Sequence, residues 1–304
     1  MKVFVAGGTG TIGVPLVRAL VARNHQVFAT TRSDKKQTLL RELGATPVVV
    51  DALNGAALDK ALSSAAPTHV IHELTALPKT GPRSAQDLEP TNRLRDAGTR
   101  NLLHAAIAAG AQRIIAGSFA LIGAAPAQQT SNPELGRAGE AVRSMEHQIL
   151  EAARRRAIEG IVLRYGLFYG PGNPATDELI SRVRRRRLPR IRNDRGQLPY
   201  IHLDDAVAAT VAALEHGTSG SVYNIVDDHP VSFSEMVTEL ARVAGASPPF
   251  TVPAWLVRLA APYMARLFTV QLALSNKEAR QDLKWTPTFP SYRDGLRQIM
   301  QRAA

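Results

Sequence analysis

Short apolar runs in the first half of the chain alternate with stretches of helical periodicity. The apolar runs predict strands at 2–6, 26–30, 47–51, 69–72, 113–117 and 160–164. Between them, apolar residues recurring at helical spacing predict helices at 12–22, 35–43, 55–63, 92–109 and 137–156. Nearly continuous apolar strands that alternate with helices are typical of a parallel sheet covered on both faces. We therefore predict an α/β fold with a doubly wound parallel sheet of the Rossmann type.

The pattern changes after Tyr165, where a Gly-Pro-Gly-Asn-Pro turn cluster occupies 170–174. Beyond it, the sequence predicts helices at 204–215 and 234–244, a strand at 222–226 and a proline-rich tail of short helices. This second half indicates a smaller, lid-like α+β domain. We place the two domains at 1–168 and 169–304, with some segments of the second returning to the first.

A glycine-rich turn joins the first predicted strand to the first predicted helix. Gly7, Gly10 and Gly13 are spaced three residues apart. The first glycine permits a tight turn, the second lets a phosphate approach the backbone, and the third lets the helix pack close to the sheet. Free N–H groups at the helix start, from Thr11 and Ile12 onward, can then hold a pyrophosphate. The sequence therefore predicts a dinucleotide-binding site here.

The end of the second strand bears on which dinucleotide binds. An NAD site usually carries Asp or Glu there, whereas this chain has Thr31 and Arg32, followed by Asp34 between cationic neighbours. A 2′-phosphate would be stabilised by that charge, so we predict NADP, with NAD as the alternative. Asp51 and Ala52, at the end of the third strand, are predicted to lie beside the adenine.

Several further motifs resemble the extended short-chain dehydrogenases/reductases of the NAD-dependent epimerase/dehydratase type. They are VIHELTA at 70–76, GTRNLL at 98–103, LRYGLFYGPG at 163–172, IHLDDA at 201–206 and WTP at 285–287. The resemblance runs through nearly the whole chain. It implies that 1–168 binds the dinucleotide and that 169–304 mainly contacts substrate. It also implies a set of cofactor contacts beyond the glycine turn: Leu74, Thr75, Ala76, Ser118, Arg143, Tyr165, Gly166 and Leu167.

The resemblance fails at the family's proton-transfer pair, a Tyr followed four residues later by Lys. None of the six tyrosines in this chain has Lys at that spacing. The positions that should hold the pair read Gly139 and Arg143, or Ala138 and Val142 after a one-residue slip. An arginine in that place could hold ribose hydroxyls but cannot exchange a proton near neutral pH. The remaining catalytic candidates, each with a packing role as the alternative, are Ser118, Tyr165 and Tyr169.

Composition narrows the setting. The chain has a net charge of +11, concentrated in an arginine-rich segment at 182–195. Such a run can contact an anionic substrate, nucleic acid or a membrane surface, and it is more commonly a solvated helix face. No nucleic-acid motif accompanies it, so nucleic-acid binding stays a minor alternative. There are no cysteines, no paired metal-ligand spacing, no secretory signal and no transmembrane stretch. We expect a cytoplasmic protein without a metal site, and a homodimer is left open.

Together these features predict an NADP-binding, atypical member of the resembled family. The expected activity is that of a reductase, dehydrogenase or epimerase-like enzyme. Its substrate would be a small carbonyl or alcohol compound, with a nucleotide sugar or another anionic molecule among the alternatives. Because the Tyr/Lys pair is missing, a non-catalytic NADP-binding sensor or scaffold is the competing hypothesis.

Overall fold

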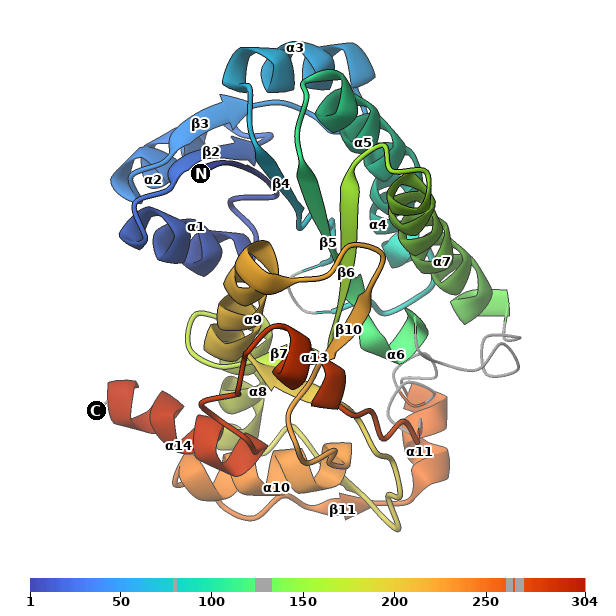
Figure 1. Cartoon of the computed structure of the whole chain (residues 1–304). Coiled ribbons are helices and arrows are strands. Elements are labelled where there is room, and N and C mark those ends of the chain that lie inside the picture. Colours follow the sequence, from blue (N-terminus) through green and yellow to red (C-terminus); the bar gives the residue numbers. More distant parts are fainter. Residues whose placement is uncertain (79–80, 124–132, 261–264, 266–270, 304) are drawn as a thin grey trace.

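A seven-stranded sheet forms the centre of the molecule (Figure 1). The computed structural model describes residues 1–78, 81–123, 133–260, 265 and 271–303. The strand order is β10-β6-β5-β4-β1-β2-β3 and every pairing is parallel. The strands are β1 (Lys2–Ala6), β2 (Gln26–Thr31), β3 (Thr46–Val49), β4 (His69–His72), β5 (Arg113–Phe119), β6 (Glu159–Tyr165) and β10 (Val222–Ile225). The order changes direction between β1 and β4, which confirms the predicted doubly wound α/β sheet.

Helices cover both faces of this sheet because its strands are apolar on both sides. One layer packs on Val3, Val5 and their neighbours; it is formed by α1 (Gly13–Ala22), α2 (Gln37–Glu42), α9 (Leu203–His216) and α13 (Lys277–Asp282). The other packs on Phe4, Val70 and Ile114; it is formed by α3 (Gly55–Ala65), α5 (Thr99–Ala108) and α7 (Pro133–Arg154). The sheet residues alternate between the two cores, so neighbours along a strand face different helix layers.

The single helix predicted over 92–109 is broken in the structure. It consists of α4 (Glu89–Arg93), a π-helical turn over Leu94–Gly98, and α5. The turn lies against α7: Ser144 donates to the Asp96 carboxylate at 2.7 Å, and Gln148 Nε2 donates to the Asp96 carbonyl oxygen at 3.2 Å. These side chains offer Asp96 partners outside its own helix, and periodicity along one segment cannot reveal such partners.

A smaller part lies below the carboxyl ends of the central strands in Figure 1. Its own core includes Leu198, Tyr200, Val237 and Leu240. This part contains two short pairs of parallel strands. One pair is β7 (Leu167–Tyr169) with β9 (Tyr200–His202), and the other is β8 (Arg190–Ile191) with β11 (Thr251–Val252). Its helices are α8 (Pro174–Arg184), α10 (Phe233–Val243), α11 (Ala254–Ala260) and α14 (Tyr292–Ala303). The sequence analysis did not predict the four short strands. The 168/169 boundary stays a prediction, although β10 does return to the central sheet.

The arginine-rich segment runs from the end of α8 through β8, and most of its arginines are exposed. Arg182 pairs with Glu178 one helical turn earlier, at 2.7 Å. Within the described ranges, no helix combines the length and the apolar character that a membrane crossing needs.

Candidate functional site

The glycine turn has the geometry that a pyrophosphate needs. Gly7 has a φ of +96°, which favours glycine, and its N–H donates to Thr30 Oγ1 at 2.9 Å. A Cβ on Gly13 would lie 2.2 Å from the Gly7 carbonyl oxygen, so only glycine lets α1 begin this close to β1. Gly10 is exposed, and α1 begins at Gly13 with Ile12 as its N-cap residue, which makes no side-chain capping bond. Amides at a helix start can bind an anion, and the pyrophosphate contact stays a prediction.

A pocket lies next to the end of β2, on the side where the adenosine is predicted. It is lined by Arg32, Leu53, Gln86, Glu89, Pro90, Arg93 and Leu94. Arg93 is a second exposed cation that the sequence analysis did not single out, and Glu89 is held by Arg137 at 3.0 Å.

Next to this pocket, Asp51 accepts from the Leu53 N–H at 3.0 Å. The buried Ala52 offers its carbonyl oxygen to Asn101, also at 3.0 Å. Thr31 is buried and its hydroxyl bonds Ser33, so it shapes the end of β2. Whether Asp51 and Ala52 contact an adenine stays a prediction.

The end of β4 and the loop that follows it are fixed by hydrogen bonds at His72 and Ala76. His72 Nε2 lies 2.8 Å from Thr99 Oγ1, and its Nδ1 accepts from the Leu74 N–H at 3.2 Å. Burial lowers the pKa of His72 to about 4, so the ring is neutral. Farther along, Ala76 donates its N–H to Thr91 at 2.9 Å, whereas Thr75 is exposed. The loop predicted to line the cofactor is thus held by hydrogen bonds at both ends, and its middle residue, Thr75, is exposed to solvent.

Glu73, which follows β4 directly, is the least expected residue of the site. Its carbonyl oxygen would be 2.6 Å from a Cβ on Gly7, and its carboxylate Oε2 would be 2.3 Å from a Cβ on Gly117. Glu73 therefore has its backbone carbonyl against the end of β1 and its carboxyl group against β5. Oε1 lies 2.9 Å from the Tyr165 hydroxyl, and that hydroxyl lies 2.7 Å from Thr210 Oγ1 on α9. Burial raises the pKa of Glu73 to about 8.

Ser118 is tied to a buried ion pair on the other face of β5. Its hydroxyl donates to Glu146 Oε1 at 2.6 Å. The same carboxylate accepts two bonds from the Arg164 guanidinium, at 2.9 and 2.6 Å. Because a serine hydroxyl has one hydrogen, Ser118 has none left to donate to a substrate carbonyl in this arrangement. The predicted catalytic role for Ser118 thus has no support in this geometry.

Glu146 also shows which face of α7 points at the site. Ala138, Val142 and Glu146 are spaced four residues apart and are all buried. Ala138 and Val142 pack with Leu88 and Phe119 in a small apolar cluster. Gly139 and Arg143 each follow Ala138 and Val142 by one residue; Gly139 is buried and Arg143 is exposed. The predicted ribose contact of Arg143 stays a prediction, and the choice between the two registers is left open.

Both candidate tyrosines have buried hydroxyl groups with protein partners. Tyr165 bonds Glu73 and Thr210, and its pKa is raised well above its usual value, mainly by burial. Tyr169 donates to Asp227 at 3.0 Å within the core of the smaller part, and burial raises its pKa too. These surroundings favour packing roles. Gly166 is buried and Leu167 is half-buried beside Tyr165, and their predicted cofactor contact is untested.

Sequence reasoning missed Glu73, Thr210, Arg164 and the inward orientation of Glu146. One signal was present: Glu73 is a carboxylate placed directly after an apolar strand, where a parallel sheet opens. In the part of the chain that the structure describes, no three His, Cys, Asp or Glu side chains are grouped to hold a metal ion.

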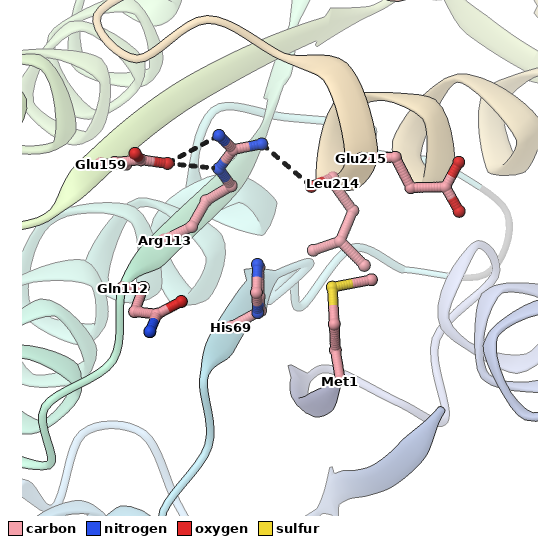
Figure 2. Close-up of a pocket in the computed structure, with 7 residues that line it drawn as sticks. All are labelled: Met1, His69, Gln112, Arg113, Glu159, Leu214 and Glu215. Carbon is pink, nitrogen blue, oxygen red and sulfur yellow. Dashed lines mark hydrogen bonds and ion pairs between the residues drawn. The ribbon is translucent and has the colours of Figure 1, made fainter. Parts of the chain in front are cut away.

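A second pocket lies at the amino ends of the strands, on the opposite edge of the sheet (Figure 2). It is lined by Met1, His69, Gln112, Arg113, Glu159, Leu214 and Glu215. Arg113 pairs with Glu159 at 2.6 Å and donates to the last carbonyl oxygens of α9, including that of Leu214 at 2.9 Å. The arginine therefore caps a helix. We place the site at the carboxyl edge, where ligands bind in sheets of this kind.

Comparison with known proteins gives a family and a fold. The model of the NAD dependent epimerase/dehydratase family matches residues 3–226. A 3-diazoavenalumate denitrifying reductase from a Streptomyces species is 38% identical over 308 residues, covering 97% of this chain and 99% of that protein. The structure of a dTDP-glucose 4,6-dehydratase double mutant from Streptomyces venezuelae with NAD bound superimposes with a TM-score of 0.80 at 18% identity, covering 99% and 96% of the two chains. The Thermus thermophilus UDP-glucose 4-epimerase complex with NAD gives 0.77 at 21%, covering 99% and 98%.

Proposed function

Because the chain belongs to the NAD dependent epimerase/dehydratase family, we propose that it is an NADP-dependent reductase of small molecules, with a conjugated diazo compound as its first candidate substrate. The observation that carries this proposal is the apolar stripe of α7. Ala138 and Val142 are buried there, and neither the Gly139/Arg143 register nor the slipped Ala138/Val142 register supplies a Tyr and a Lys.

A helix turns about 100° per residue, so Ala138 lies about 80° and Gly139 about 20° from Glu146 around the axis of α7. The contact of Glu146 with Ser118 therefore does not choose between the two registers, and neither position holds a tyrosine. A phenol cannot come from either residue, so a reaction at this site proceeds without the family's proton donor.

The residues present fit a dinucleotide. The uncapped amides at the start of α1 and the open surface at Gly10 would hold its pyrophosphate. Arg32 and Arg93 line one pocket from two elements, and together they suit the 2′-phosphate that distinguishes NADP from NAD. When bound, the nicotinamide would supply a hydride.

A diazo substrate suits a site without a tyrosine acid. Reducing a ketone requires a proton on the oxygen as hydride reaches the carbon. In the protonated diazo form, the diazonium ion, hydride forms the new C–H bond while the C–N bond breaks and N₂ leaves with the electron pair. The overall change, in which a diazo compound takes up one hydride and one proton and releases N₂, balances. The relative named as a diazo-compound reductase, 38% identical along the whole chain, supports this choice.

The test is to follow NADPH oxidation by the full-length protein with an ortho-hydroxyaryl diazo compound, beside aryl ketones and a UDP-sugar. With NADPH deuterated at C4, we expect deuterium on the carbon that lost nitrogen, at a rate above that of an enzyme-free control. Turnover of ketones alone would replace the diazo assignment with carbonyl reduction. Tight NADPH binding without turnover of any substrate would favour the sensor hypothesis.

A further inference from the structure

Three short contacts along Glu73, Tyr165 and Thr210 need three hydrogens, and the Tyr165 and Thr210 hydroxyls carry two, so all three contacts are hydrogen-bonded only when Glu73 is a neutral carboxylic acid. Thr210 donates to the Ala206 carbonyl oxygen at 2.7 Å, which uses its only hydroxyl hydrogen. The 2.7 Å contact between Thr210 and Tyr165 then takes the tyrosine hydrogen. A third hydrogen is needed for the 2.9 Å contact between Tyr165 and Glu73, and only a protonated Glu73 supplies it.

If Glu73 is instead ionised, Tyr165 donates to its Oε1, and one of the other two contacts loses its hydrogen. Tyrosine and threonine hydroxyls can rotate between these two arrangements without moving a heavy atom. The three hydrogen-bonded side chains can therefore accommodate both charge states of Glu73. The neutral state is favoured because all three contacts are then hydrogen-bonded.

Glu73 lies at the edge of the sheet where the proposed dinucleotide would bind. The sheet order changes direction between β1 and β4, and in sheets of this kind the ligand lies in the crevice at that point. Glu73 follows β4 directly; its carbonyl group lies against Gly7 and its carboxyl group against Gly117. With the adenosine half on the Arg32 side, over β2 and β3, the β4–β5 side that holds this carboxyl is left for the nicotinamide half.

We propose that Glu73 stores the proton that reduction consumes, being protonated when the bound dinucleotide is reduced and ionised when it is oxidised. The proposal rests on the dinucleotide-dependent function above. The oxidised nicotinamide carries a positive charge and the reduced one does not, so only the oxidised form stabilises a carboxylate beside it. In turnover, the proton lost by Glu73 balances the proton gained by the substrate, and hydride gives the second hydrogen.

The surroundings of Glu73 suit this role. Tyr165 on β6 is the ionisable group bonded to it, and it stays neutral because its own pKa is raised. His72 precedes Glu73, points into the opposite helix layer and is neutral. The ion pair of Glu146 with Arg164 lies on that opposite face too. Burial keeps Glu73 protonated, with its pKa at about 8, and a cation within about 4–6 Å lowers a carboxyl pKa by about 1–3 units.

Proton release on cofactor binding tests the proposal without any substrate. A lowering of about 2 units from the value of about 8 predicts release of about 0.8 proton per NADP⁺ bound at pH 7 and none per NADPH. Calorimetric titrations in buffers of different ionisation enthalpy give these counts. Glu73→Gln should abolish the difference, because the amide mimics only the neutral acid. Glu278→Gln, at an exposed carboxylate on α13, is the matched control and should leave it unchanged.

A second measurement needs no variant. The dissociation constant of NADPH divided by that of NADP⁺ should rise by roughly 50-fold between pH 6 and 9, since a higher pH favours the ionised acid that NADP⁺ stabilises. Titration of the 2′-phosphate does not contribute, because both dinucleotides carry it and its effect cancels in the ratio. In Tyr165→Phe the ionised acid loses its donor, so the shift should move to higher pH. A flat ratio in the wild type, or equal proton counts in wild type and Glu73→Gln, would overturn the proposal. Failure of both dinucleotides to bind would overturn the proposed function with it.

Discussion

Replacing Arg32 by alanine is expected to weaken binding of the phosphorylated dinucleotide selectively. Arg32 is exposed at the end of β2 and shares its pocket with Arg93 from α4. If both guanidinium groups contact the 2′-phosphate, each loss should raise the dissociation constant of NADPH and leave that of NADH nearly unchanged, because NADH lacks the group that they bind.

The exposure of both side chains sets the magnitude. Hydrogen bonds to charged groups contribute about 1.5–3 kcal/mol in proteins, and solvent screening places exposed ones near or below the lower end. We therefore expect about 1–2 kcal/mol for Arg32→Ala, which corresponds to about 5–30-fold weaker NADPH binding. Arg93→Ala should weaken NADPH binding in the same direction, because Arg93 lines the same pocket.

Calorimetric or fluorescence titration with NADPH and NADH, at two salt concentrations, measures both effects. The NADPH penalty should shrink at higher salt, since screening already weakens the contact in the wild type. Arg41→Ala is a suitable control, because Arg41 is exposed on α2 and bonds Gln37 at 3.0 Å outside the pocket. Equal losses for NADPH and NADH would refute the assignment of Arg32 to the 2′-phosphate.

Four further variants test the site by other measurements. Gly10→Val should abolish NADPH binding in fluorescence titration while circular dichroism shows an intact fold, because the side chain fills the place of the pyrophosphate. Glu146→Ala should lower the free energy of unfolding in urea by roughly 3 kcal/mol, since it leaves Arg164 unpaired. Tyr169→Phe should cost about 1–2 kcal/mol of stability with unchanged NADPH affinity; a large loss of affinity would return Tyr169 to the active site. The folded state holds the Glu73 proton up to pH about 8, so wild-type stability should fall between pH 5 and 8 by up to about 1.4 kcal/mol per unit, and Glu73→Gln should remove that slope.

The central sheet and the glycine turn were predictable because their signals are local. An apolar strand followed by Gly7, Gly10 and Gly13 can be recognised within one short segment, and the structure confirms the sheet that it begins. The doubly wound arrangement followed from the right-handed crossovers between parallel strands, whereas the order of the strands came from the structure. The four short strands of the smaller part were not predictable in this way, since two or three residues carry too little periodicity to distinguish a strand from a turn.

The buried acid was not predictable from local signals. Glu73, Tyr165 and Thr210 lie on three different elements, 92 and 45 residues apart in sequence, and each looks ordinary in its own segment. A glutamate after a strand is usually solvated. Its neutral state depends on the hydroxyl groups that the fold brings to it, and these become visible only when β4, β6 and α9 are placed together.

The register of α7 shows how one residue decides a chemical conclusion. A slip of one position turns a side chain by about 100°, which here exchanges an exposed arginine at 143 for a buried valine at 142. With Arg143 at the site, a cation could have replaced the family's lysine in holding ribose. With Val142 there, an apolar side chain takes that position, and the contact between Glu146 and Ser118 is compatible with both registers, because Val142 and Arg143 lie about 40° and 60° from Glu146 around the helix. Neither register places a tyrosine on α7, so in the reduction that we propose the proton comes from another group, and we propose Glu73 at the end of β4 for that role.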